Sequence, residues 1–160
     1  MQDILEFWFP NNEFNKFWFD KSKDEFIIQN FKDRLLQLEN SKLNFNLSDK
    51  VILENIILLD QFSRSIYRNN PTKVKENDNK ALALTEYFFE NRDWKNIKFN
   101  HIIFYLMPYR HTFKKEYYIK IFEILNFFKK ENNSKLFEKF YNVTNKKYTL
   151  LNTITKCNSF

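Results

Sequence analysis

Apolar residues recur three or four positions apart along most of the chain, which is the spacing of a helix that buries one face. The first clear case is the set Phe26, Ile27, Phe31, Leu35 and Leu38. It predicts a helix over about 23–39 that ends at Asn40. Ser22 and Glu25 have the spacing of a capping box, so we expect Ser22 to cap this helix.

The next segment is apolar around most of its circumference. Ser48 is a good N-cap residue, and the apolar positions that follow it continue to about Tyr67. A helix that is apolar on nearly every side is buried on nearly every side. We therefore expect this to be the central helix.

The rest of the chain continues the helical pattern. Further helices are predicted over about 76–90, 97–106, 115–130 and 134–141, with breaks near Pro10, Pro71 and Pro108. Alternation of apolar and polar residues, the mark of a strand, never persists. The fold class is therefore all-α: a compact superhelix or bundle of about six to eight antiparallel helices. No stretch has the composition of a linker, so we expect a single domain over residues 1–160 with frayed last residues.

Glycine is absent, and this excludes several kinds of site. P-loops, dinucleotide-binding fingerprints and nucleophile elbows all need Gly where the backbone turns sharply or approaches a phosphate. Helix ends that need a left-handed residue should use Asn instead, and Asn40, Asn91 and Asn132 stand at such places.

Cys157 is the only cysteine, and the chain starts without a signal-peptide pattern. Both features favour a cytoplasmic, reducing location. No apolar run approaches the ~20 residues of a membrane span. With two His and one Cys, none at ligand spacing, neither a metal nor another cofactor is expected.

The net charge of +6 is unevenly distributed. Residues 1–90 carry 12 basic and 15 acidic side chains, whereas residues 91–160 carry 14 and 5. A basic half attracts nucleic acid or anionic lipid. Because its lysines never exceed two in a row, a solvated basic face is the better interpretation than a nucleic-acid interface.

The candidate chemistry lies on the central helix. Helical geometry places Asp60, Gln61, Arg64 and Arg68 on one face. Asp60 is one turn from Arg64, so it can hold that guanidinium, while Arg68 is left seeking an acceptor. Two Arg in a chain that prefers Lys point to planar, bidentate geometry. The pair is either a structural Arg knot, a binding site for carboxylate or phosphate, or part of a catalytic site.

Two other features have competing interpretations. His111 follows Pro108 at the end of a predicted helix, where it either caps and packs or acts as a general base or anion ligand. His101 is expected to be structural. The aromatic segments 4–9 and 17–19 form either core or a ligand platform, and core is favoured.

The ordered segments Leu59-Asp60-Gln61-Phe62-Ser63-Arg64-Ser65-Ile66-Tyr67-Arg68 and Tyr105-Leu106-Met107-Pro108-Tyr109-Arg110-His111 resemble the family catalogued as domain of unknown function 924. The similarity runs along nearly the whole chain. It implies a small helical superhelix related to tetratricopeptide repeats and implies no particular activity. Ser63 stands where the family has Pro, and residues 140–147 lack the Arg and His of the corresponding family stretch.

The sequence leaves three functional hypotheses. The first is a helical binding or adaptor module whose cleft, lined by Gln61, Arg64, Arg68 and His111, accepts an anionic small molecule or a peptide carboxylate. The second is a small-molecule enzyme in which His111 and Asp60 act as acid and base. The third is a degenerate, non-catalytic interaction protein.

Overall fold

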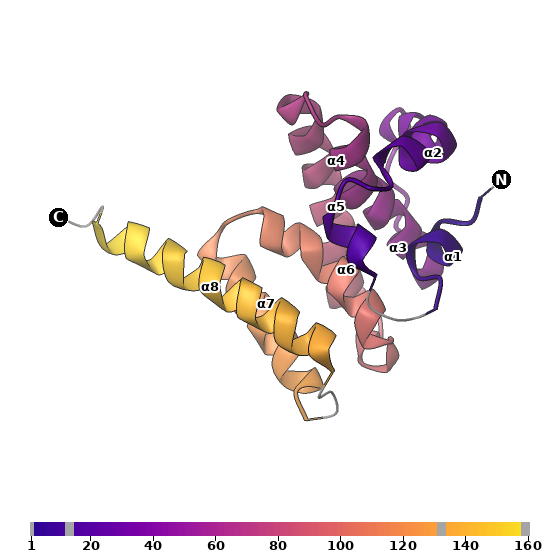
Figure 1. Ribbon diagram of the computed structural model, residues 1–160. Coiled ribbons are helices and arrows are strands. Elements are labelled where there is room, and N and C mark those ends of the chain that lie inside the picture. The colour runs from indigo at the N-terminus through magenta and orange to yellow at the C-terminus, as the bar shows by residue number, and fades with distance from the viewer. Residues whose placement is uncertain (1, 12–14, 131–133, 158–160) are drawn as a thin grey trace. The chain divides into compact units, whose positions relative to one another are not determined.

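The computed structural model describes residues 2–11, 15–130 and 134–157, and within them every regular element is a helix (Figure 1). The predicted all-α class is confirmed. The chain forms two compact units, Met1–Trp94 and Lys95–Phe160. The single domain expected over residues 1–160 stays a prediction. Residues 158–160, where fraying was expected, lie outside the described part.

The first unit opens with short helical pieces around aromatic side chains. Helix α1 spans Ile4–Trp8, and a 3-10 turn, η1, spans Lys16–Phe19. The indole of Trp18 donates to the carbonyl of Trp8 at 2.6 Å, which ties the two pieces together. The core interpretation of these aromatics therefore fits half of them, since Trp8, Phe9 and Trp18 are buried, whereas Phe7 and Phe17 are partly exposed and Phe19 is exposed.

Helix α2, Asp24–Glu39, agrees closely with the predicted helix over 23–39. It buries Ile27, Phe31 and Leu35, which stand at helical spacing, as the pattern requires. Its start differs from the prediction. Lys23 is the N-cap residue, and the Ser22 hydroxyl donates to Asp20 instead of capping the helix.

The central helix is continuous but not α-helical throughout. It runs as α3, Asp49–Ile56, then a π-helical segment η2, Ile57–Phe62, and then α4, Ser63–Ile66. Ser48 caps its start, accepting from the Val51 N–H at 3.4 Å as expected. Most of its apolar residues are buried, so it is a main element of the first unit's core.

Helix α5, Pro71–Asn91, completes the first unit and packs against η2, α3 and α4. It begins five residues earlier than predicted. Asn70 caps it by accepting from the Lys73 N–H, and Pro71 fits at the first helical position because no N–H is needed there. A short 3-10 turn, η3, spans Trp94–Asn96.

The second unit consists of α6, Phe99–His111, α7, Lys115–Phe128, and α8, Lys135–Cys157. Helix α7 packs on both of the others, and α6 also contacts α8. Helix α8 is much longer than the predicted 134–141. Its later turns also carry apolar residues at helical spacing, including Leu150, Leu151 and Ile154.

Two predictions about helix ends are wrong. Pro108 lies inside α6, which continues to His111, so it does not break the helix. The missing N–H costs one backbone hydrogen bond, and burial of nearly every residue around Pro108 holds the helix together. Asn40 is right-handed at φ −87°, and Asn91 is the last residue of α5. Asn132 lies outside the described residues.

Phe113 alone among the described residues has a positive φ, 53°. It follows α6 closely, so the left-handed residue after this helix is a Phe and none of the three Asn that were expected to take this conformation. Within the same residues, no helix combines the length and the apolar character needed to cross a lipid bilayer.

Candidate functional site

The π-helical segment decides how the central helix presents its polar residues. In a π-helix each N–H bonds five residues back, so the turn is wider than the α-helical turn assumed from sequence. Asp60 and Gln61 lie in this segment, and Arg64 lies in the α-helical turn that follows. Asp60 is completely buried, whereas Gln61 and Arg64 are partly exposed. The polar stripe formed by Asp60, Gln61 and Arg64 therefore runs from the interior of the first unit to its surface.

Arg64 is held by two carboxylates. Its guanidinium grips Asp78 of α5 with both terminal nitrogens, at 2.7 and 3.0 Å, and lies 3.6 Å from the Asp60 carboxylate. It also donates to the Asp60 carbonyl at 2.5 Å. Burial lowers the pKa of Arg64, but the charges of Asp60 and Asp78 and the Asp78 hydrogen bond outweigh that effect, so the pKa is raised. This half of the pair is an Arg knot.

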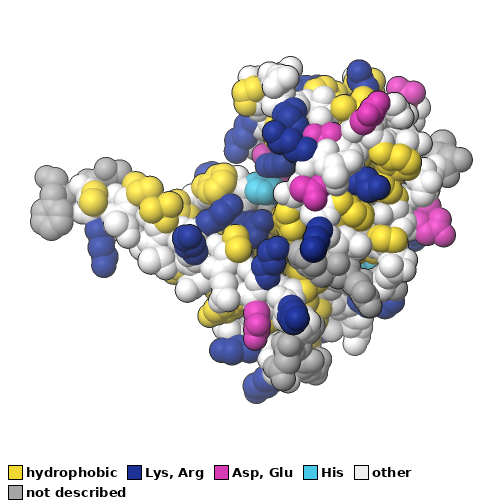
Figure 2. All heavy atoms as spheres, viewed as in Figure 1, with side chains coloured by type: hydrophobic (Ala, Val, Ile, Leu, Met, Phe, Trp, Pro, Cys, Tyr) yellow, Lys and Arg dark blue, Asp and Glu magenta, His cyan; other side chains and the backbone are white. Residues whose placement is uncertain are grey.

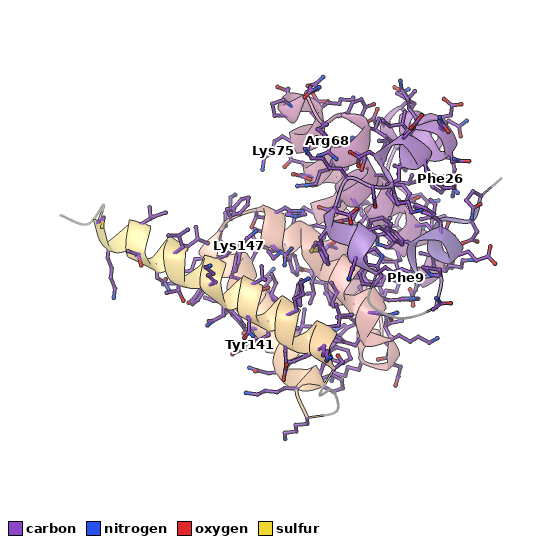
Figure 3. The ribbon with its side chains drawn as sticks, in the orientation of Figure 1. Phe9, Phe26, Arg68, Lys75, Tyr141 and Lys147 are labelled. Atoms are coloured by element: carbon purple, nitrogen blue, oxygen red, sulfur yellow. The ribbon has the colours of Figure 1, made fainter. Side chains whose placement is uncertain are left out.

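Arg68 has a partner that the sequence did not indicate. One terminal nitrogen forms an ion pair with Asp24, the first residue of α2. The expectation that Arg68 lacks an acceptor is therefore wrong, since the acceptor is 44 residues away in the chain. The two side chains are 40% and 18% exposed, so the pair is in contact with solvent. Figure 3 labels Arg68 among the side chains of the first unit.

A cavity of about 240 Å³ lies beside these arginines within the first unit. Its lining joins the 3-10 turn to the polar stripe, and comprises Trp8, Phe17, Trp18, Phe19, Asp20, Lys21, Ile27, Gln61, Arg64, Ser65 and Arg68. Three of these side chains are cationic and one, Asp20, is acidic. The Ser22 hydroxyl and backbone N–H lower the pKa of Asp20, so it stays ionised. The lining therefore has a net positive charge.

A second, more open cavity of about 410 Å³ adjoins the first. Ser65 and Arg68 line both, and the rest of its lining is Asp24, Ile28, Ile66, Tyr67, Asn69 and Asn70. The Arg68–Asp24 ion pair thus stands where the two cavities meet. A movement of the Arg68 side chain alters both of them.

The wall near Tyr67 is fixed by a partly buried hydrogen-bond network on Glu39, the last residue of α2. The Tyr67 hydroxyl donates to the Glu39 carboxylate at 3.0 Å, and the Asn77 amide donates to it at 2.7 Å. Burial, together with the hydrogen bond and charge of Glu39, raises the pKa of Tyr67 to about 12. Tyr67 is therefore a neutral hydrogen-bond donor at physiological pH.

The two histidines belong to the second unit. His111 is the last residue of α6 and is partly buried. His101 lies in the first turns of α6, where burial and the nearby charge of Lys98 lower its pKa to about 4. A neutral, half-buried imidazole fits the structural role expected of His101.

The carboxylates nearest the predicted site are already committed. Asp60 and Asp78 both form ion pairs with the Arg64 guanidinium, so their negative charges are already neutralised within the protein. The complete burial of Asp60 does not favour direct contact between this group and a substrate. The pairing of Asp60 with His111 as base and acid stays a prediction.

Sequence reasoning missed several residues of this site. Asp24 and Asp78 are ordinary acidic residues on other helices, and Lys21 is one of 21 lysines. The aromatic residues at 17–19 were assigned chiefly to the core, yet Phe17 and Phe19 also line the cavity. The run of three aromatics just before a predicted helix was the one feature of the sequence that could have indicated an aromatic wall of a cavity.

Comparison with known protein families gives a match over most of the chain. The family model described as "Bacterial protein of unknown function (DUF924)" matches residues 4–155. No curated protein matched the chain, and no solved structure matched it either.

Proposed function

The chain belongs to this bacterial family of unknown function, and we propose that its first unit is a binding module for a small anion with a compact apolar body. The anion is a carboxylate or a phosphate, either of a free small molecule or of a peptide. The observation that carries the proposal is the 240 Å³ cavity, in which cationic and aromatic side chains converge. The cytoplasmic location favoured by the lone Cys157 belongs to the same proposal.

Charge supports an anionic ligand. Lys21 and Arg68 are the cations that a ligand can use, because Arg64 is already gripped by Asp78 and Asp60. Among the described residues, only Asp24 forms an ion pair with Arg68, through a single nitrogen. A planar guanidinium offers several donors in one fork, so Arg68 can turn a second edge to a carboxylate.

Size and shape support a small, partly apolar ligand. Ligand pockets for drug-sized molecules have volumes of about 300–1,000 Å³, and this cavity is smaller. Phe17 and Phe19 supply aromatic surface on one side, and Phe19 is exposed. The Gln61 amide nitrogen already donates to Asp60, and its second N–H can orient the polar end. A benzoate-like molecule matches these features better than a bare ion does.

Thermal unfolding in the presence of sodium benzoate, acetate or phosphate tests the proposal, with sodium chloride at equal ionic strength as the reference. A ligand at a hundred times its Kd stabilises the folded state by about 2.7 kcal/mol. For a chain of this size that corresponds to a rise in Tm of about 5–10 °C. We expect benzoate to exceed acetate, because only benzoate covers the aromatic wall.

Arg68→Gln should remove most of this rise, and Arg34→Gln is the matched control. Arg34 also forms an ion pair, with Glu54 at 3.5 Å, but it lines neither cavity. The proposal fails if no anion raises Tm beyond the chloride reference, or if Arg68→Gln responds as fully as the Arg34→Gln control.

A further inference from the structure

Helix α8 of the second unit has two apolar faces. The inner face packs on α7, where Tyr148 lies 6.4 Å from Tyr118 and 5.4 Å from Phe122 between ring centroids. Tyr118 is in the first turn of α7, so the turns of α8 after Tyr148 extend beyond that helix (Figure 1).

The outer face of α8 exposes aliphatic side chains. Val143, Leu150 and Ile154 are 38%, 60% and 51% exposed. At about 100° per residue they fall within an arc of about 40°, so they form one stripe along the helix. Isolated exposed apolar residues are ordinary, but a stripe over three turns marks a surface that contacts something apolar.

Lysines border this stripe on both sides. Viewed down the helix axis, Lys146 lies on one side of the stripe and Lys147 lies on the other. Residues 139–157 contain no acidic residue. The second unit as a whole carries 13 basic and 4 acidic side chains. In Figure 2, hydrophobic and basic side chains lie side by side along the surface formed by α8.

Phe113 extends the same surface. Its ring is 55% exposed, and the Lys147 ammonium lies 5.4 Å from the ring centroid. Its backbone is left-handed, a conformation that is unfavourable for a residue with a side chain. The fold therefore keeps an exposed aromatic ring beside the α8 stripe in a backbone conformation that lowers stability. Such a local conflict is typical of a functional surface.

We propose that this lysine-bordered face, made of Phe113, Val143, Lys146, Lys147, Leu150 and Ile154, binds the surface of an anionic lipid membrane. An interfacial helix lies in the headgroup region with its apolar side buried a few ångströms deep and its lysines at the phosphates. Nucleic acid would satisfy the lysines but leave the aliphatic stripe in water. The joint presence of both groups is what selects lipid.

Flotation with vesicles tests this with the full chain. We expect the protein to float with equimolar phosphatidylglycerol and phosphatidylcholine, to stay behind with pure phosphatidylcholine, and to detach as salt rises. Lys146→Gln with Lys147→Gln should weaken partitioning about thirtyfold, from about 1 kcal/mol per lysine. Leu150→Ser with Ile154→Ser should weaken it at least about tenfold, because the stripe is lost.

Matched controls use exposed residues of the first unit. Leu36→Ser removes an aliphatic side chain exposed on α2, and Lys42→Gln removes a lysine, so both should leave partitioning unchanged. Phe113→Asn separates binding from folding. Asn tolerates the left-handed conformation, so Tm should stay level or rise while partitioning falls about fivefold or more.

Three results would overturn the proposal. One is equal flotation with neutral and anionic vesicles, and another is undiminished flotation of the Leu150→Ser, Ile154→Ser variant. The third is binding to duplex DNA or polyglutamate that falls with the lysine variant but not with the serine variant. That pattern would assign the face to an acidic macromolecule instead of a membrane.

Discussion

Arg64 and Arg68 are the same residue type one turn apart, yet their surroundings give them different consequences for stability. Arg64→Ala leaves the buried Asp60 and the nearly buried Asp78 without their cation, which costs about 3–5 kcal/mol. Arg68→Ala removes a solvent-exposed pair with Asp24 and costs about 0–1 kcal/mol. Urea unfolding of both variants beside the parent protein measures the difference.

Arg64→Lys refines this prediction. Lysine keeps the charge but loses the bidentate hydrogen bond to Asp78. The fall in the free energy of unfolding for Arg64→Lys should therefore lie between zero and that of Arg64→Ala. Equal losses for Arg64→Ala and Arg68→Ala would mean that both arginines are structural, and would weaken the case for Arg68 as a ligand group.

His101 gives stability a dependence on pH. Its pKa is about 4 in the folded chain and about 6.5 when unfolded. Between these values the unfolded state binds more protons, so the free energy of unfolding falls as the pH is lowered from 6.5 to 4. Allowing for the partial exposure of the ring, the loss is about 1–3 kcal/mol.

Chemical unfolding at several pH values measures the effect of His101. His101→Gln should flatten the slope between pH 4 and 6.5. Retention of the full slope in His101→Gln would show that other groups cause the acid sensitivity.

At the scale of the element, the π-helical segment is what sets the polar stripe apart from an ordinary amphipathic face. Ser63 follows this segment directly, and its buried hydroxyl donates to the Leu59 carbonyl at 2.5 Å. The hydroxyl thus satisfies a carbonyl within the widened turn. We expect this bond to help hold η2 in its π geometry.

Ser63→Ala should lower the free energy of unfolding by about 1 kcal/mol, the usual contribution of a hydrogen bond. Ser41→Ala is the matched control, since the exposed Ser41 hydroxyl donates to the Leu38 carbonyl at 3.0 Å and water can replace it. Urea titration compares the two. A loss for Ser63→Ala no larger than the control's would show that the hydroxyl does not support the segment.

Helix α6 shows how burial overrides local preference. Proline inside a helix removes a hydrogen bond and clashes with the preceding turn, so the sequence placed a break at Pro108. The helix nevertheless continues to His111, because its residues from Ile102 to Arg110 are buried and packing compensates the local cost. Two residues at the end of this helix depart from their conformational preferences: Pro108 lies inside the helix, and Phe113 just after it is left-handed.

At the scale of the molecule, the two proposals belong to different units. The anion cavity lies in the unit with the net negative charge, where its cationic lining is a local exception. The lysine-bordered face lies in the basic unit and follows its overall charge. Their tests are therefore independent, since variants in one unit leave the residues of the other unchanged.

The sequence by itself determined the all-α class, most helix positions and the family. These depend on periodicity and ordered motifs, which are local properties of the chain. It also grouped Gln61, Arg64 and Arg68 by helical spacing, and all three line one cavity although the helix ends at Ile66, before Arg68.

Only the tertiary structure decided which of these groups are already occupied. Asp24 and Asp78 reach Arg68 and Arg64 from other helices, and the π-helical turn changes the face on which Asp60 and Gln61 stand. The cavity also needs Phe17, Phe19 and Lys21 from a separate turn. Such pairings depend on packing between segments distant in sequence, and helical spacing carries information only about neighbours three or four residues apart.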